Sequence, residues 1–310
     1  MAPIPAASGV DPEALDLSGR LITTARLVEE WYHDVDDPES FMEKLKRAGT
    51  NADVFTFWQR LPDTEPRYPY RLKWETIAVL PVTTYEYWWK TQINNKTRNL
   101  VVKARKKGVV VRKAEFDDKF VEGMTAIFNE TPVRQERKFL HYGKTFETVK
   151  RQFSRFLFRE EILGAYLGDE LIGFAILADA GRFAALTQII SCVKHRDKSP
   201  NNALMAKAVE VCAERKVSQL VYALWPRGPL RDFKRHNGFE PVNLPRYYVP
   251  LTIKGALALK LNLHRSLADH LPEATVVFFK DIRSKFYAFR YGDGSPAKAS
   301  GAVSPEQQGN

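Results

Sequence analysis

A basic loop that leads into a helix-like run is the segment of this chain best suited to hold an anion. An apolar, strand-like run ends at Cys192, a loop containing Arg196 and Lys198 follows, and helical apolar spacing resumes after Pro200. The first N–H groups of a helix have no partner within it and carry a partial positive charge, so such a terminus binds phosphate. Arg196 and Lys198 can neutralise part of that phosphate's charge.

The residues at the start of that helix also suit close approach of a ligand. Asn201 tolerates a left-handed backbone, Asn202 is expected to cap the helix, and Ala203 leaves the backbone accessible. Ser199 precedes them in the same loop. On the residues alone, this segment predicts either an ordinary capped helix or a phosphate site.

Candidate bases and nucleophiles are few near that loop. The strand before it holds no carboxylate, and the nearest candidate bases in motif order are Glu130, Glu136 and Asp232. His195 has an ordinary pKa in the useful range, although a histidine among loop lysines is more often simply exposed. Cys192 can act as a nucleophile only with a base beside it, and a buried strand cysteine is the commoner case.

The charge of the chain is concentrated in one quarter of its length. The 47 lysines and arginines exceed the 37 acidic residues by ten. Residues 90–159 alone hold 18 basic and 7 acidic residues, so this quarter carries the whole excess. The densest part, Lys96 to Gly108, predicts a helix that ends at the glycine. Its cations form either a solvated helix face or a site for phosphates of a cofactor, a nucleic acid or a charged lipid.

Length and composition exclude several classes of protein. With 310 residues, 44% hydrophobic and 27% charged, the chain is expected to form one large or two smaller globular domains. No apolar run is long enough to span a membrane, and residues 1–19 lack the features of a secretory signal. Two cysteines and six scattered histidines predict neither a disulfide scaffold nor a metal site. We therefore expect a soluble cytoplasmic protein.

The pattern of apolar residues predicts an alternating α/β fold with a mixed sheet. From residue 109 the expected order is β-α-α-β-β-β-α-β-α-β. The predicted strands are 109–115, 161–167, 171–178, 184–192, 219–225 and 239–251, the last broken at Pro245, and the predicted helices are 118–129, 145–158, 202–215 and 230–236. Short turns between the three central strands require antiparallel hairpins.

Two motifs resemble those of the GNAT acyltransferases. The segment Lys198-x-x-Asn201-x-Ala203 resembles the Gln/Arg-x-x-Gly-x-Gly/Ala loop that binds the pyrophosphate of acyl-coenzyme A in that family. The segment Phe233 to Phe239 is similar to the family's Tyr-x-x-x-Gly-Phe helix end. Lys234 stands where the family has the tyrosine that protonates the departing thiolate, and a protonated lysine would stabilise that thiolate electrostatically. The alternative for Lys234 is a surface lysine of the helix.

Three further segments resemble the FemAB-like branch, which pairs two GNAT-type folds. They are the basic helix Arg98 to Gly108, the Glu-Thr-x-x-Arg element from Glu130 to Arg134, and the Pro-Asn loop from Ser199 to Leu204. The resemblance implies a reduced first fold at 20–95 and a GNAT-like acyltransferase domain at 96–251, after residues 1–19, which we expect to be disordered. A helical extension at 252–291, beginning with an amphipathic helix at 253–271, and a disordered tail at 292–310 would follow.

The resemblance implies an acyltransferase that moves an acyl group from acyl-coenzyme A to an amine or a hydroxyl, without a metal. Glu130, Arg134 and Lys234 are its implied catalytic residues. The implied cofactor-binding residues are Ile190, Cys192, Arg196, Lys198, Ser199, Asn201, Asn202, Ala203 and Trp225. Two alternatives stay open: an aminoacyl transferase that uses aminoacyl-tRNA, and a non-catalytic protein that binds anions or RNA. The helix at 253–271 either packs on the fold or touches a membrane surface.

Overall fold

A computed structural model describes residues 15–262, apart from 29, 31–34, 36, 135–136, 156 and 227–228. The predictions for 276–291 and for the tail at 292–310 lie outside these residues. The first eight residues of the predicted 253–271 helix form α8 (Ile253–Lys260). Leu15–Ser18, which were expected within a disordered terminus, form strand β1 instead.

One ten-stranded mixed sheet runs through all of the described chain. Its strand order is β1-β2-β3-β12-β4-β11-β10-β9-β8-β5. The strands are β1, β2 (Thr24–Leu27), β3 (Val54–Trp58), β4 (Arg71–Pro81), β5 (Val109–Lys113), β8 (Glu160–Leu167), β9 (Glu170–Asp179), β10 (Ala184–Ser191), β11 (Gln219–Leu224) and β12 (Glu240–Pro250).

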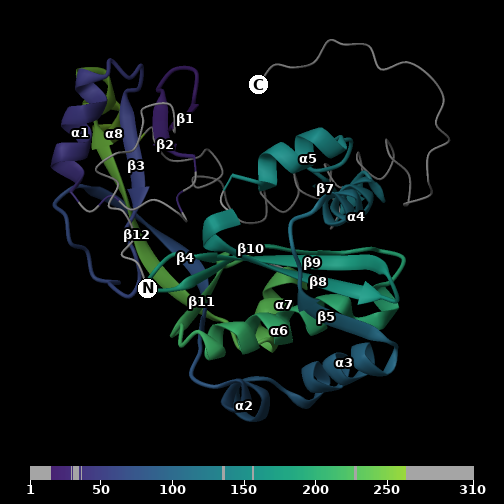
Figure 1. The fold of residues 1–310 in the computed structure, drawn as a ribbon. Coiled ribbons are helices and arrows are strands. Elements are labelled where there is room, and N and C mark those ends of the chain that lie inside the picture. The colour runs from purple at the N-terminus through teal and green to yellow at the C-terminus, as the bar shows by residue number, and fades with distance from the viewer. Residues whose placement is uncertain are drawn as a thin grey trace.

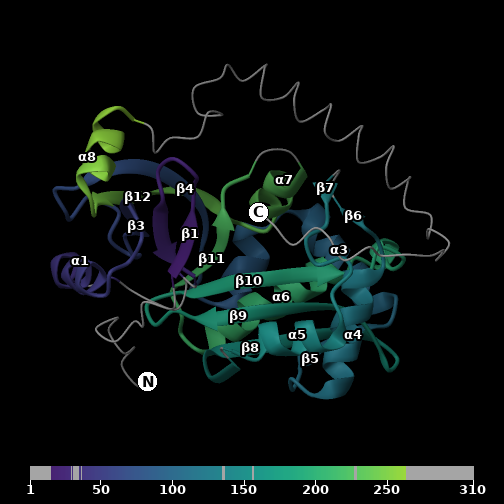
Figure 2. The same cartoon turned by 90° about the horizontal axis from the view of Figure 1, so that it is seen from above.

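Helices cover both faces of the part of the sheet that contains β5 and β8–β11. Helices α3 (Asn95–Lys106) and α6 (Pro200–Glu214) lie on one face, and α4 (Asp118–Asn129) and α5 (Phe146–Phe153) lie on the other (Figures 1 and 2). Each face has its own apolar core. The core under α6 includes Leu204, and the core under α4 includes Phe128.

This part of the fold confirms the order predicted from the sequence. The strands β8, β9 and β10 pair as antiparallel hairpins, and α4 has the predicted bounds. Gly108, at φ +79°, follows the end of α3, as expected for a glycine that ends a helix. Helix α5 is shorter than predicted because it ends at Phe153. A short hairpin of β6 (Val133–Arg134) and β7 (Arg137–Lys138) was not predicted.

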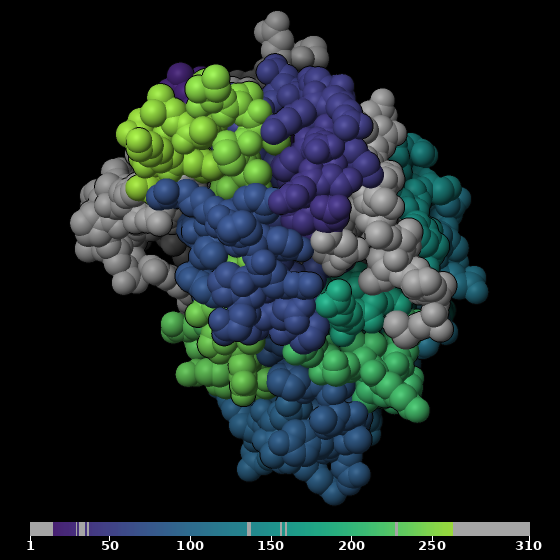
Figure 3. Space-filling view, turned by 90° about the vertical axis from the view of Figure 1, so that its left-hand side faces the viewer, coloured from purple at the N-terminus to yellow at the C-terminus, as the bar shows by residue number. Residues whose placement is uncertain are grey.

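The N-terminal elements extend the same sheet. Strand β4 pairs with β11 on one side and with β12 on the other, and β12 then pairs with β3. Phe55, Phe57 and Tyr247 form the centre of a separate core under α1 (Pro38–Arg47). Figure 3 shows α1 in purple and α8 in yellow-green side by side at one end of the molecule.

Strand β12 is continuous through Pro245, where the sequence predicted a break. Pro245 pairs with Trp74 of β4, and its carbonyl accepts the Gln59 N–H at 3.0 Å. A proline removes only the N–H of its position from a sheet, so its carbonyl still contributes to the pairing. The break in the strand was predicted from the residue type of Pro245. The strand is continuous because β3 and β4, which are distant in the sequence, pair with it on both sides.

Candidate functional site

The parallel strands β10 and β11 separate in the middle of the sheet. They pair only at Ala184 with Leu220 and at Ala185 with Val221. Beyond these pairs β10 continues along β9 as far as Ser191, while β11 shifts its register against β4. In α/β folds ligands bind beyond the carboxyl ends of such strands, where neighbouring connections diverge. The separated ends of β10 and β11 are therefore the candidate site.

Lys234 reaches the β11 side of this site from helix α7 (Pro229–His236). Its Nζ donates to the carbonyl of Leu224 at 2.8 Å and to that of Tyr222, three residues and one residue beyond the last pair with β10. The same Nζ lies 4.0 Å from the centre of the Tyr222 ring. Lys234 is only 1% exposed, so the alternative of a surface lysine is wrong.

Burial changes the acid strength of Lys234. Desolvation of the ammonium lowers the pKa of Lys234 from 10.5 to about 8. An ammonium has three N–H donors, and two of them are used on β11. The Lys234 ammonium therefore lies at the end of β11 and loses its proton far more easily than the ammonium of an ordinary lysine.

Glu130 and Arg134 lie together on the β10 side. The Glu130 carboxylate accepts the N–H groups of Val193 at 2.5 Å and Lys194 at 2.9 Å. Arg134 donates to the Ser191 carbonyl at 2.8 Å and lies 3.2 Å from Glu130. Because both charged groups hold the backbone that follows β10, the arrangement suits them to position that loop.

Arg134 also joins the loop to helix α4. Its second terminal nitrogen donates to the Ile127 carbonyl at 2.8 Å, and its guanidinium lies 4.9 Å from the centre of the Phe139 ring. Desolvation lowers the pKa of Arg134, and the negative charge of Glu130 offsets part of this decrease. A guanidinium stays protonated at any pH of interest, so Arg134 is a fixed cation here.

The start of α6 differs from its predicted form. Ser199, at φ +56°, is the residue before the helix and has the left-handed backbone that was predicted for Asn201. The helix begins at Pro200, so Asn202 does not cap it. Proline is favoured at the first helical position because its fixed φ suits the helix and the N–H that it lacks has no partner there.

Most N–H groups that could bind phosphate at this terminus are already used. The backbone N–H of Lys198 donates to the His195 carbonyl at 3.0 Å, and that of Ser199 donates to the Arg196 carbonyl at 3.1 Å. The N–H of Asn202 donates to the Ser199 carbonyl at 3.1 Å. Ala203 donates to the same Ser199 carbonyl at 3.4 Å, and Pro200 has no N–H. From residue 198 to 203, the N–H of residue 201 alone has no backbone acceptor. Little remains to hold a diphosphate.

The other predicted cofactor-binding side chains are mostly in the core. Ile190 and Cys192 pack in the core under α4. Desolvation raises the pKa of the Cys192 thiol to about 11, which removes it as a nucleophile near neutral pH. Trp225 packs partly buried against the core under α6, and its backbone N–H donates to the Thr76 carbonyl at 2.8 Å. Arg196 is exposed.

An ion pair network beside the loop was not predicted. Glu170, the first residue of β9, lies 2.6 Å from Lys194 Nζ and 3.4 Å from His195 Nε2. The hydrogen bond from Lys194 lowers the pKa of Glu170 despite its desolvation. No local signal in the sequence identifies Glu170, because its pairing depends on β9 and β10 being neighbours.

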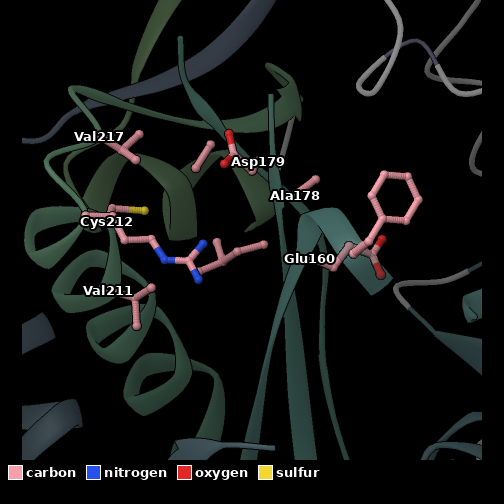
Figure 4. Close-up of a pocket in the computed structure, with 10 residues that line it drawn as sticks. Glu160, Ala178, Asp179, Val211, Cys212 and Val217 are labelled. Atoms are coloured by element: carbon pink, nitrogen blue, oxygen red, sulfur yellow. The ribbon is translucent and has the colours of Figure 1, made fainter. Parts of the chain in front are cut away.

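A pocket of about 400 Å³ lies at the opposite end of α6, and none of the predicted site residues lines it. In Figure 4, Val211 and Cys212 come from α6, Ala178 and Asp179 from β9, and Glu160 from β8. Within the described ranges, no three histidine, cysteine or acidic residues are grouped to hold a metal. Nor is any helix of residues 15–262, as far as they are described, long and apolar enough to cross a membrane.

Comparison with solved structures identifies the fold. The crystal structure of FemX covers 79% of this chain and 85% of its own, with 11% identity and a TM-score of 0.52. The C-terminal domain of a putative lysylphosphatidylglycerol synthetase from Agrobacterium fabrum matches at 13% identity, over 79% of this chain and 83% of its own, with a TM-score of 0.53. L-PGS from Bacillus licheniformis matches at 13% identity, over 87% of this chain and 85% of its own, with a TM-score of 0.52.

No family model matches the sequence, and no curated protein matches it by sequence either. Identities of 11–13% establish the fold alone. The chain therefore shares the mixed α/β fold of FemX and of these two proteins, as expected for the GNAT-type fold that its motifs predicted.

Proposed function

We propose that this protein is a GNAT-type acyltransferase whose donor is an aminoacyl-tRNA and whose acceptor is an amine or a hydroxyl. The observation that carries the choice of donor is the start of α6. There most of the backbone N–H groups that would hold the pyrophosphate of coenzyme A are bonded internally, Pro200 has none, and only that of residue 201 lacks a backbone acceptor. An ester-linked RNA donor does not need a diphosphate at this position. The likeness in fold to a protein named a putative lysylphosphatidylglycerol synthetase, a name that implies transfer of an aminoacyl group, also supports this choice.

The proposed reaction is direct attack on the aminoacyl ester. The acceptor nitrogen or oxygen bonds to the carbonyl carbon, a tetrahedral intermediate forms, and the bond to the 3′-terminal ribose oxygen breaks. The ribose oxygen takes up one proton, and the acceptor releases one to water. Effective catalysis needs a cation or an acid where the negative charge develops.

Lys234 supplies that cation in the proposal. Its ammonium stabilises the leaving oxygen and donates the proton, since its pKa of about 8 makes it a stronger acid than an ordinary lysine. It takes over the role that the resemblance assigns to a tyrosine. Glu130 and Arg134 then act as positioning residues that fix the backbone after β10, where the oxyanion donors would lie.

A second candidate donor is acyl-coenzyme A. The observation that favours it is the backbone N–H of Asn201, the one N–H between residues 198 and 203 that has no backbone acceptor. Lys198, with 22% of its side chain exposed, is close enough to contribute a charge. A single phosphate oxygen could satisfy part of this arrangement, although not a whole pyrophosphate cradle.

The test uses hydroxylamine as a general small acceptor. The protein is mixed with a set of tRNAs charged with radiolabelled amino acids, or with acetyl-coenzyme A, and hydroxamate formation is compared with the uncatalysed rate. We expect acceleration with at least one charged tRNA, and a loss of roughly 100-fold or more for Lys234→Met. Acceleration with acetyl-coenzyme A alone would show that acyl-coenzyme A, and not aminoacyl-tRNA, is the donor. No acceleration with either donor would favour a non-catalytic protein that binds anions or RNA.

Because Lys234 is buried, Lys234→Met has to be shown to fold. Thermal unfolding and near-ultraviolet circular dichroism check this. Lys234→Arg serves as a second variant, because it keeps the charge but raises the pKa. Retained stability with lost activity would support a role of Lys234 in the chemistry.

A further inference from the structure

Strand β11 contains a bulge at the point where it separates from β10. Along its other edge the strand pairs Val221 with Val79 of β4 and then Leu224 with Ile77, so three steps on β11 match two steps on β4. One extra residue is therefore inserted between these two pairs, which makes this part of the strand a β-bulge. We call residues 222–224 the β11 bulge. Pairing with β4 before and after it fixes both of its ends.

Ala223, in the middle of the β11 bulge, has a left-handed backbone with φ +47°. Residues with a Cβ rarely adopt this conformation, and a bulge that needs it usually has a glycine there. Of the described residues other than glycine with a positive φ, the remaining three are Ser199, Lys216 and Asn262, which all lie beside the end of a helix. Ala223 is exposed, so packing of its own side chain does not explain why the strand holds this strained backbone.

The bulge brings two carbonyl oxygens to one ammonium. Lys234 Nζ donates to the carbonyl of Leu224 at 2.8 Å and also to the carbonyl of Tyr222. In a regular strand the carbonyls of residues i and i+2 are about 6.7 Å apart, because each residue rises about 3.3 Å. One nitrogen cannot donate to both at hydrogen-bond lengths of about 3 Å or less. The left-handed residue between the two carbonyls is what allows them to share one donor.

The β11 bulge holds this ammonium with neutral groups. Besides the two carbonyls, the ring of Tyr222 contacts it, with the ring centre 4.0 Å from Nζ. Burial raises the pKa of the Tyr222 phenol to about 12, so this ring is uncharged near neutral pH. No described residue forms a salt bridge with Lys234, and the one acid of α7, Asp232, pairs with Arg235 at 3.3 Å. The buried cation therefore has acceptors but no counter-ion.

The absence of a counter-ion among the described residues has a consequence for acid strength. A carboxylate beside the ammonium would favour its charged form and raise the pKa of Lys234. Carbonyls and a ring satisfy the N–H groups without cancelling the effect of burial, and the pKa stays at about 8. Two of the three N–H groups are used on the bulge, which leaves one for another acceptor.

We propose that Ala223 is a positioning residue, whose left-handed backbone forms the β11 bulge and thereby seats the Lys234 ammonium at the open end of β11 without a counter-ion. This inference rests on the proposed function in one respect, the use of that ammonium as the acid for the leaving oxygen. The seat itself belongs to the folded protein, so it can be tested without any donor or acceptor.

The first experiment compares Ala223→Asn with Ala223→Val, two side chains of comparable size. Asparagine tolerates a left-handed backbone, whereas the β-branched valine does not. The pKa of Lys234 is measured by NMR on protein with isotope-labelled lysine, and Lys234→Arg identifies its signal. We expect Ala223→Asn to keep the pKa near that of the wild type. Ala223→Val should move it toward the ordinary 10.5, because an ammonium without its seat extends to water.

The same two variants separate positioning from bulk in the proposed reaction. With a charged tRNA and hydroxylamine, Ala223→Val should lose roughly tenfold or more in kcat at pH 7, and the fall of its rate at high pH should begin later. Ala223→Asn should lose far less. Equal effects of the two variants on pKa and rate, or no effect of either, would overturn the proposal.

A second experiment needs no valine variant, which could fail to fold. Ala223→Gly is made in the wild type and in Lys234→Met, and the urea midpoint of each protein is measured. Glycine relieves the left-handed strain, so we expect a rise in the wild type. In Lys234→Met the strand is free to straighten, and the gain should be smaller or absent. Effects of glycine on the unfolded chain are the same in both and cancel.

The matched control is Ala256→Gly, at an exposed position of α8, in the same two backgrounds. It should change the urea midpoint by the same amount in both, because α8 does not contact Lys234 through any described interaction. If Ala223→Gly also changes both midpoints equally, the lysine and the bulge are independent and the proposal is wrong.

Failure of the proposed function gives a different pattern. If the wild-type protein transfers from neither donor, but the titration of Lys234 and the urea midpoints change as expected, the seat stands and only its catalytic use is wrong. If transfer occurs while Lys234 titrates identically in Ala223→Asn and Ala223→Val, the bulge does not position the lysine, whatever the activity.

Discussion

The ammonium of Lys234 lies 2.8 Å from the carbonyl oxygen of Leu224, in the part of strand β11 that no longer pairs with β10. Strand β11 pairs with β10 only as far as Val221, so the carbonyls beyond that point need another donor. Lys234 provides it from α7. One side chain thereby stabilises the separated strands and brings a positive charge to their ends.

The buried lysine makes stability depend on pH. The pKa of Lys234 is about 8 in the folded protein and near 10.5 when unfolded, so the unfolded chain binds more protons between these values. Its contribution to the free energy of unfolding therefore rises with pH from about 8 to 10.5, by about 3 kcal/mol. Urea unfolding of the wild type and of Lys234→Met, compared across this range, measures the difference. A constant difference would mean that the lysine titrates normally.

The same pKa sets the pH dependence of the proposed reaction. If the Lys234 ammonium is the acid, kcat should fall about tenfold per pH unit above pH 8 in the wild type. Lys234→Arg should keep whatever activity it has to higher pH, because its group stays protonated. Rates from pH 6 to 10 with a charged tRNA test this. A flat wild-type profile would assign the lysine a structural role only.

Glu130 should matter for stability as well as for activity. Glu130→Ala leaves two N–H groups after β10 without their acceptor and removes the ion-pair partner of Arg134, so we expect a loss of about 3 kcal/mol. Glu86→Ala, which breaks the exposed pair with Lys90, is the matched control and should cost far less than Glu130→Ala. Urea unfolding measures both. Equal small effects would show that Glu130 does not hold the loop.

Much of the fold could be predicted because its signals are local. Helix α4 has apolar residues at helical spacing and an aspartate before it, and the structure starts and ends it at the predicted residues. The hairpins of β8–β10 follow from short turns. The insertion of β4 between β11 and β12 could not be predicted, because these pairs join residues far apart in the chain.

The site was predictable in part for the same reason. A basic loop and the start of a helix can be recognised from residue types. The helix was predicted to begin at Asn202, but it begins at Pro200, a residue that suits the first position of a helix. Lys234, Arg235 and His236 are adjacent polar residues of α7. Which of them is buried depends on how α7 packs against β11, so no local pattern distinguishes Lys234.

Both cysteines should be unreactive in the folded protein. Desolvation raises the thiol pKa of Cys192 to about 11 and that of Cys212 to about 12. Reaction with a disulfide reagent at pH 8 should therefore be slow until the protein is unfolded in urea, when two thiols react. Cys192→Ala should retain most of the transferase activity. Fast labelling of Cys192, with loss of activity, would instead support an acyl-carrying thiol.

Coenzyme A should not stabilise the protein. The N–H groups of Lys198, Ser199 and Asn202 are bonded within the loop, and Pro200 has none, so a pyrophosphate would have to break existing hydrogen bonds to bind. A ligand at 100 times its dissociation constant would add about 2.7 kcal/mol to the free energy of unfolding. We expect thermal unfolding with millimolar acetyl-coenzyme A to show no such gain. A rise of several degrees that is abolished by Lys198→Glu would instead establish acyl-coenzyme A as the donor.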